Sequence, residues 1–348
     1  MRVIAVLFLL AFAVIMILTV REYRPGDTES LTVHSSPGIT YQPLATGEEI
    51  NIVTLNVGYG ALGDNADFFM DGGKSVTTAT ETRLAQNLAG IKGMLADTAP
   101  DIILLQETDQ NSSRSYHTDE TIDFSSAFPY YDNTFAYNFK VDFVPYPIPP
   151  IGKVASGLMT LSRYQISSAE RIALPCSFSW PVKVANLKRC LSVNRLPLQN
   201  SDKELVIVNL HLEAYDDGEG KEAQTKMLAD FLKQEADKGN YVIAGGDFNQ
   251  SFSGTDTSAY PELEGMWHCG LLNQNSFDQR FRFLADPSAP SCRSLDKPIA
   301  GADRDNFQYY LIDGFIVSGG VQVKSVTTLQ YDFKYTDHNP VLLKVSLN

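Results

Sequence analysis

The segment that most constrains this chain is residues 241–249, where an apolar run ends in two glycines and then in Asp247 and Asn249. The letters Tyr-Val-Ile-Ala are typical of a buried strand, and the two glycines mark its sharp end. A carboxylate and an amide at a strand end suit a hard metal ion and the water or phosphate that it binds. Gly, Asp and Asn are also ordinary turn residues, so this segment alone does not separate a site from a turn.

Residues with metal or acid/base chemistry also lie at or near the ends of the other predicted strands. Any one of them has an ordinary explanation, such as a core histidine or a turn. Strand ends at one edge of an α/β sheet lie near one another, so the whole set predicts a single cleft. The candidates are Asn56, Glu107, His211, Asp247, Asn249, Asp313, Asp337 and His338.

The position of Glu107 in its strand can be inferred, because this residue follows a run of four large aliphatic residues, 102–105, and one glutamine. A carboxylate buried without a partner in such a strand would be costly. We therefore expect Glu107 at the mouth of the strand.

The predicted elements alternate between strands and helices. Apolar residues recur at helical spacing over residues 80–97 and 220–237. Strands are predicted over residues 50–57, 101–108, 157–162, 204–212, 241–249, 309–317, 322–329 and 339–347. Strand, helix, strand occurs twice, between 50 and 108 and between 204 and 249, which favours α/β layers.

Composition limits the classes of function. The chain has 348 residues, of which 44% are hydrophobic and 11% aromatic, enough for a packed core in one large domain or two small ones. The net charge of -13 argues against nucleic-acid binding through a broad basic face, because Lys and Arg supply most of that affinity. A metal site can still be acidic locally.

Residues 3–20 form an uncharged apolar run that reaches about 27 Å as a helix, close to the thickness of a bilayer core. A cleaved signal peptide is the alternative, but the one small-x-small match, Ala11-Phe12-Ala13, lies inside the run. We favour a membrane anchor over residues 1–20, a linker over 21–47 and a catalytic domain over 48–348. The domain is expected outside the cytoplasm, membrane-anchored or secreted.

Three further features leave alternatives open. The cysteines are expected either as two disulfides with the shortest loops, 176–190 and 269–292, or as four thiols. The aromatic and proline-rich residues 124–151 are expected to be core or loop packing, with some at the rim of a cleft or against a lipid surface. Residues 176–190 are expected to form an irregular flap.

The polar segments, taken together and in order, resemble the successive motifs of the endonuclease/exonuclease/phosphatase superfamily. The resemblance covers about residues 48–348, and it departs from the usual pattern at Thr336, where Ser is usual. The segments are Leu55-Asn56-Val57, Gln106-Glu107, Asn209-Leu210-His211, Gly246-Asp247-Phe248-Asn249, Ile312-Asp313-Gly314-Phe315 and Thr336-Asp337-His338-Asn339-Pro340. The resemblance implies a DNase I-like fold, which is a four-layer α/β sandwich of two mixed sheets with helices outside.

The resemblance also implies roles for the candidate residues. Glu107 is expected to be the main Mg²⁺ ligand, with Asn56 and Asp337 completing or neighbouring the metal site and Mn²⁺ as a substitute metal. His338 is expected to be the general base, oriented by Asp313. The remaining candidates are expected to position the nucleophile and the phosphate or to donate a hydrogen bond or proton toward the leaving group: Asp247, Asn249 and His211.

The resemblance leads to a metal-dependent phosphohydrolase, most readily a phosphodiesterase. Its expected substrate is a phospholipid head group, a nucleic acid or a small phosphodiester, and its expected membrane contact is the N-terminal helix. The alternatives are an extracellular nuclease of the same fold and a non-catalytic module that binds a phosphorylated ligand. Against the last, the Glu, Asp-x-Asn and Asp-His elements are all present.

Overall fold

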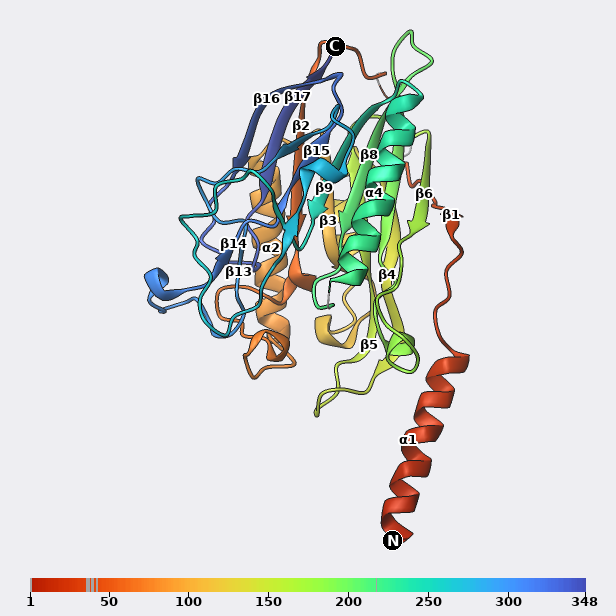
Figure 1. Ribbon diagram of the computed structural model, residues 1–348, viewed down its shortest axis with the longest axis vertical. Helices are drawn as coiled ribbons and strands as arrows, with labels where there is room; N and C mark the ends of the chain where they lie inside the picture. The colour runs from red at the N-terminus through yellow and green to blue at the C-terminus, as the bar shows by residue number, and fades with distance from the viewer. Residues whose placement is uncertain (1, 36–37, 39–40, 42, 217) are drawn as a thin grey trace.

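Two β-sheets packed face to face form the centre of the computed structural model, which describes residues 2–35, 38, 41, 43–216 and 218–348 (Figure 1). Within these residues the first sheet has the order β16 (Val321–Thr328), β17 (Val341–Leu347), β2 (Glu49–Asn56), β3 (Ile102–Asp109), β5 (Gly152–Ser162), β4 (Asp132–Val144). The second has the order β1 (Thr28–Ser30), β6 (Ser168–Ala173), β7 (Cys190–Pro197), β8 (Glu204–His211), β9 (Tyr241–Asp247), β15 (Asp313–Val317), β12 (Arg282–Leu284).

Both sheets are mixed. The pairs β2/β3 and β8/β9 are parallel, and the other pairs in the two sheets are antiparallel. A parallel pair needs a crossover, and the crossovers here are the predicted helices α2 (Glu81–Asp97) and α4 (Glu219–Asp237). Thr80 caps α2 by accepting a hydrogen bond from the Arg83 backbone N–H. The predicted α/β fold with two mixed sheets is confirmed.

Alternation along the strands produces three apolar layers. In β2, Ile50 and Ile52 face the second sheet, whereas Val53 and Leu55 pack under α2. In β8, the side chains of residues 205 and 207 enter the core between the sheets, and those of 206 and 208 pack under α4. The helices therefore lie outside the two sheets (Figure 1).

The Gly-Gly pair of β9 lies inside the strand rather than at its end. A Cβ on Gly245 would come within 2.6 Å of the Phe315 ring and 2.9 Å of Leu104 in the opposite sheet. Gly246 has φ +152°, and a Cβ there would stand 2.0 Å from the carbonyl oxygen of Leu210. These glycines let β9 approach its neighbours closely just before Asp247.

The N-terminal residues form helix α1 (Arg2–Val20), which projects from the end of the molecule opposite the C-terminus (Figure 1). Among the described residues, no helix is long and apolar enough to cross a membrane, so the predicted anchor is not supported. Within the predicted linker, Thr28–Ser30 pair with β6 and His34 bridges to Asn133. Other linker residues (36, 37, 39, 40 and 42) lie outside the described part.

Two segments for which no strand or helix was predicted contain regular structure. The aromatic stretch holds the end of α3 (Glu120–Ala127) and the whole of β4, a 13-residue strand. The predicted flap contains a short 3-10 helix, η4 (Val182–Ala185), and leads into β7. All four cysteines are free thiols, so neither of the predicted disulfides is present. Short pairs complete the fold: β10 (Ser251–Phe252) with β11 (Leu271–Leu272), and β13 (Cys292–Arg293) with β14 (Tyr309–Tyr310).

Candidate active site

All eight predicted site residues converge on one cavity of about 710 Å³ at the end of the two sheets. Seven of them line it directly, and the eighth, Asp313, contacts the ring of His338. Strand register explains the convergence in the second sheet, because Asp247 of β9 pairs with His211 of β8 on one side and Asp313 of β15 on the other.

His338 and Asp313 form a buried ion pair. The His338 Nδ1 lies 2.8 Å from the Asp313 Oδ2, and its Nε2 lies 3.8 Å from the Asp247 Oδ2. Burial acts to lower the pKa of His338, but the negative charges of Asp313 and Asp337 and the hydrogen bond with Asp313 outweigh it and raise that pKa well above its ordinary value. Burial and the neighbouring Asp313 raise the pKa of Asp247 to about 7.

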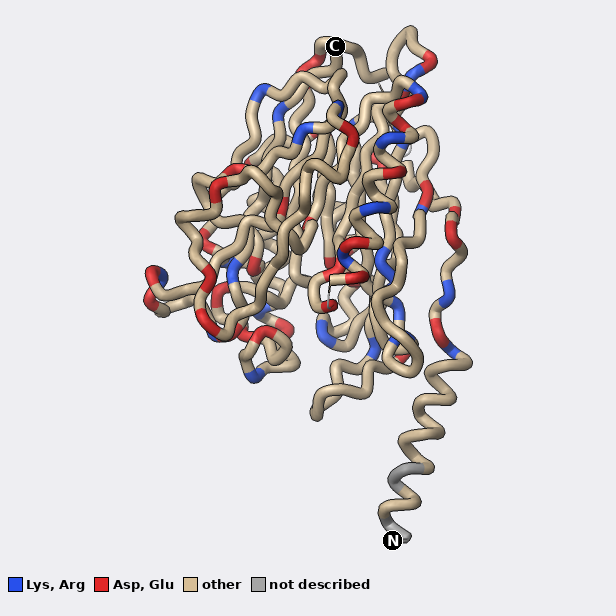
Figure 2. The backbone as a smooth tube through the Cα atoms, viewed as in Figure 1, with Lys and Arg blue, Asp and Glu red and all other residues tan. Residues whose placement is uncertain are grey.

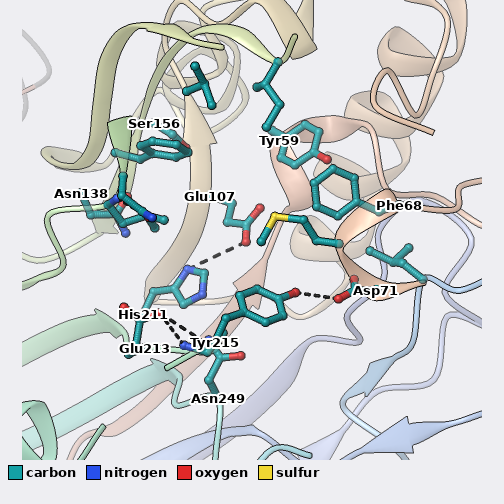
Figure 3. Close-up of a pocket in the computed structure, with 18 of the residues that line it drawn as sticks. Tyr59, Phe68, Asp71, Glu107, Asn138, Ser156, His211, Glu213, Tyr215 and Asn249 are labelled. Carbon is teal, nitrogen blue, oxygen red and sulfur yellow. Dashed lines mark hydrogen bonds and ion pairs between the residues drawn. The ribbon is translucent and has the colours of Figure 1, made fainter. Parts of the chain in front are cut away.

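The pKa of the second histidine, His211, is shifted in the opposite direction from that of His338. The His211 Nε2 lies 3.4 Å from the Asp247 Oδ2, and its Nδ1 lies 4.0 Å from the Glu107 Oε1 (Figure 3). Burial, together with the positive charges of Arg189 and His338, lowers the pKa of His211 well below its ordinary value. His211 is therefore neutral at physiological pH and can donate a single N–H.

Asn56 joins the two sheets at the site. Its Nδ2 donates to the Asp247 Oδ2 at 3.1 Å and to the Glu107 Oε1 at 3.3 Å, and its Oδ1 accepts from the Gly58 N–H. The Thr336 hydroxyl donates to the Asn56 carbonyl at 2.9 Å, which ties the segment before Asp337 to the end of β2. Threonine thus serves where the resemblance led us to expect serine.

Asp247 and Asn249 are held in place by hydrogen bonds with the backbone. The Asn249 N–H donates to the Asp247 Oδ1 at 2.9 Å, and the Asn249 side chain donates to the Leu212 carbonyl at 2.9 Å. Asn249 has φ +51° and Glu107 has φ +55°, a left-handed conformation that asparagine adopts readily but that is uncommon for glutamate. Both residues with a positive φ are site candidates.

The donor set fits a hard divalent cation. Glu107, Asn56 and Asp337 offer oxygen ligands, and the pKa of Asp337 is raised by burial and by repulsion from Glu107. A bound cation would relieve that repulsion. Among the described residues, two groups have ligand atoms within 4.8 Å of one another: Asp247 with Asp313 and His338, and Cys292 with Asp337 and His338.

Two arginines of the cavity lie outside the predicted set of site residues. Arg189 is buried beside His211, donates to its carbonyl at 3.3 Å and leaves its Nε without a hydrogen bond in the described structure. Arg114 stacks 3.7 Å over the Tyr59 ring and pairs with Asp109. Arg189 lies in the segment predicted as an irregular flap, where its charge was the only signal, and nothing local distinguished Arg114.

A second polar pair, Tyr215 and Asp71, stands across the cavity from Glu107 (Figure 3). The Tyr215 hydroxyl donates to the Asp71 Oδ1 at 2.6 Å. Burial raises the pKa of Asp71 to about 6. Both residues lie outside the predicted strands and helices.

A family model described as "Endonuclease/Exonuclease/phosphatase family" matches residues 53–338. The chain belongs to this family. Its members are phosphoesterase-type hydrolases that generally depend on a divalent metal, and the resemblance found in the sequence is confirmed. No curated protein matches the chain.

Solved structures confirm the fold at low sequence identity. An endonuclease/exonuclease/phosphatase from Beutenbergia cavernae has a TM-score of 0.55 and 15% identity, covering 86% of this chain and 72% of its own. The human nocturnin catalytic domain with bound sulfate has a TM-score of 0.53 and 16% identity, covering 91% and 97%. TDP2 of D. rerio with a single-stranded DNA product has a TM-score of 0.52 and 14% identity, covering 86% and 99%.

Proposed function

We propose that this chain is a metal-dependent phosphodiesterase that uses Mg²⁺, with Mn²⁺ as a substitute. The observation that carries the proposal is the buried His338–Asp313 pair, 2.8 Å apart, opposite Asp247 in the same cavity as Glu107. In the reaction, water attacks phosphorus and one P–O ester bond breaks. The products are a phosphomonoester and an alcohol, and the proton of the water ends on the leaving oxygen.

The chain's own residues account for the proton transfers. The Asp313 carboxylate accepts the Nδ1–H of His338, which leaves Nε2 directed into the cavity to take the proton of the attacking water. Asp247 and Asn249 position the water and the phosphate. His211, held neutral by burial, donates its N–H to the phosphate or the leaving oxygen.

Glu107, Asn56 and Asp337 would hold the metal ion. When bound, a divalent cation supplies neutralisation of the charge on the non-bridging phosphate oxygens. The same residues favour a bound cation, because the carboxylates of Asp337 and Glu107 repel each other within one cavity. The negative charges that raise the pKa of His338 include Asp337, so offsetting them favours the deprotonated ring that a general base requires.

We also propose that the catalytic domain lies outside the cytoplasm, either secreted or held at a membrane by the N-terminal segment. The support is the uncharged apolar sequence of residues 3–20 near the start of the chain. A protease-protection assay on intact cells tests it. Complete protection of the domain in intact cells, lost on lysis, would contradict it.

Hydrolysis of bis(p-nitrophenyl) phosphate by the full chain in detergent tests the activity, with Mg²⁺, with Mn²⁺ and with EDTA. Metal-dependent turnover that falls by several orders of magnitude in His338→Ala is expected. Turnover that survives in that variant would refute the assignment. If no metal gives turnover, calorimetric Mg²⁺ titration separates a selective enzyme from a module that binds phosphorylated ligands.

A nuclease of the same fold is tested in parallel with plasmid DNA. The solved structure of D. rerio TDP2 contains a single-stranded DNA product. The net charge of -13 disfavours nucleic acid here. Plasmid cleavage that falls steeply with salt would favour the nuclease.

A further inference from the structure

The cavity is far larger and more apolar than a phosphate group requires. Beyond the polar cluster its wall is built from side chains of several elements that offer hydrocarbon and aromatic surface: Phe68, Phe139, Ile151, Phe178, Val184 and Trp267. A phosphodiester bound at Glu107 and His338 would place one of its ester groups along this wall. An apolar group is favoured there, because burying it removes hydrocarbon from water without leaving polar atoms unpaired.

The rim of the same cavity exposes large apolar side chains to solvent. The loop between β4 and β5 carries Ile148, which is 94% exposed, and Phe143 at its base. A second loop carries Trp180, half exposed. Residues 143–152 and 173–182 contain no charged residue in either segment. Exposed apolar surface of this extent marks a site of interaction.

Helix α1 is fixed beside this rim. Ile15 and Leu18 from its last turns line the cavity. The Trp180 Nε1–H donates to the Thr19 hydroxyl at 3.1 Å, and an ion pair of 2.9 Å joins Lys188 to Glu22. Figure 1 shows α1 and the β4–β5 loop leaving the same end of the molecule, and Figure 2 shows no Lys, Arg, Asp or Glu in the β4–β5 loop.

The distribution of apolar side chains on α1 indicates what covers it. Exposed residues occur on every side of the helix rather than along one stripe: Ile4, Val6, Leu9, Leu10, Phe12, Val14, Met16, Ile17 and Val20. A partner helix would cover a single stripe and leave the rest in water, whereas the hydrocarbon of a lipid layer would contact the helix on every side. Lys153 and Lys183 directly follow the two uncharged loops, where anionic head groups would attract them.

We propose that this end of the molecule docks on a lipid surface and that the cavity takes an amphiphilic lipid phosphodiester. The phosphate lies at Glu107 and His338, and the apolar chain runs along the wall toward the β4–β5 loop. Hydrolysis there releases one phosphomonoester and one alcohol, and the product with the apolar chain stays at the surface. The hydrolytic part of this inference rests on the proposed phosphodiesterase activity, whereas the docking does not.

The full chain and the double variant Phe143→Ser/Ile148→Ser test the docking. Neither residue lines the cavity, so turnover of water-soluble bis(p-nitrophenyl) phosphate should stay unchanged. Binding to vesicles of phosphatidylcholine and phosphatidylglycerol, measured by flotation, and release of their phosphorylated head groups should each fall about tenfold or more. Each lost side chain of this size removes roughly a factor of ten from partition into hydrocarbon.

Tyr130 supplies a matched control. It is 70% exposed and precedes the first residue of β4, about 40 Å along the strand from Phe143 near its last residue. Tyr130→Ser should behave as the wild type on vesicles, while Phe143→Ser should lose part of the binding.

The possible results separate the docking from the activity. Equal vesicle binding and head-group release by the double variant and the wild type would overturn the proposal. So would equal losses on vesicles and on the soluble diester, since these would assign Phe143 and Ile148 to the site itself. If the wild type hydrolyses neither substrate, the proposed activity fails, and flotation of the double variant still decides the docking.

Discussion

Replacing Asp313 by Asn should lower kcat for bis(p-nitrophenyl) phosphate by about 10²- to 10⁴-fold. The Asp313 carboxylate accepts from His338 Nδ1 at 2.8 Å, and both side chains are buried. A hydrogen bond to a charged group contributes roughly 1.5–3 kcal/mol, and each 1.36 kcal/mol corresponds to about tenfold in rate. Loss of the charge alone therefore accounts for a decrease in kcat of about 10- to 200-fold. An Asn that turns its NH₂ toward Nδ1 would also force the proton onto Nε2, which extends the loss toward about 10⁴-fold.

The assay is steady-state turnover of the full chain at saturating Mg²⁺, with Mg²⁺ concentration varied at fixed substrate. Asp313 is not one of the predicted metal ligands, so the Mg²⁺ concentration for half-maximal rate should stay the same while kcat falls. The exposed Asp202→Asn removes a carboxylate from the surface and should change neither quantity. An Asp313→Asn enzyme within about threefold of wild type would refute the role of the pair.

Three further predictions concern the metal site and the stability of the fold. Glu107→Gln should abolish Mg²⁺-dependent turnover and weaken Mg²⁺ binding in calorimetry with an unchanged circular dichroism spectrum; unaltered Mg²⁺ affinity would remove Glu107 from the ligand set. Gly246→Ala should lower the free energy of unfolding by about 3 kcal/mol or more, measured by urea denaturation, because its Cβ would meet the Leu210 carbonyl at 2.0 Å. A melting curve like that of the wild type would contradict this. Glu235→Gln should lower the free energy of unfolding by about 2 kcal/mol at pH 7. Burial raises the pKa of Glu235, but hydrogen bonds from Arg195, Lys238 and Asn240 outweigh it and lower that pKa to about 2. The stabilisation is therefore full above the ordinary value of 4.5 and is lost as the pH falls toward 2, so the difference between the two proteins should shrink from pH 7 to pH 3; a difference independent of pH would contradict the ion pair.

The central strands and the site could be predicted because each polar residue follows a strong local signal. Glu107 comes after an aliphatic run, and Asp247 comes after Tyr-Val-Ile-Ala-Gly-Gly. A charged residue that follows a buried strand is expected at the exposed end of that strand, because burying the charge without a partner is costly. The structure brings those mouths together in one cavity, and the roles assigned to the individual residues stay predictions.

The strands at the edges of the sheets could not be predicted from local sequence patterns. Strand β4 alternates buried and half-buried residues over its first eight positions, but its aromatic residues and the prolines that follow obscured the period. Thr28–Ser30 has no apolar residue and becomes a strand only because β6 offers a free edge. Arg114 reaches the cavity through a stack on Tyr59, a contact between segments 55 residues apart in sequence (114 − 59).

The geometry of the site depends on how closely the two sheets approach each other. Asn56 belongs to the first sheet and Asp247 to the second, yet they are joined by a hydrogen bond of 3.1 Å. Two residues before Asp247, the missing side chain of Gly245 leaves room for the Phe315 ring and Leu104 between the sheets. A larger residue there would separate β9 from β3 and stretch the Asn56–Asp247 bond. The Gly-Gly that looked like the end of a strand is therefore a packing feature, and its consequence is that residues from both sheets can act on one phosphate.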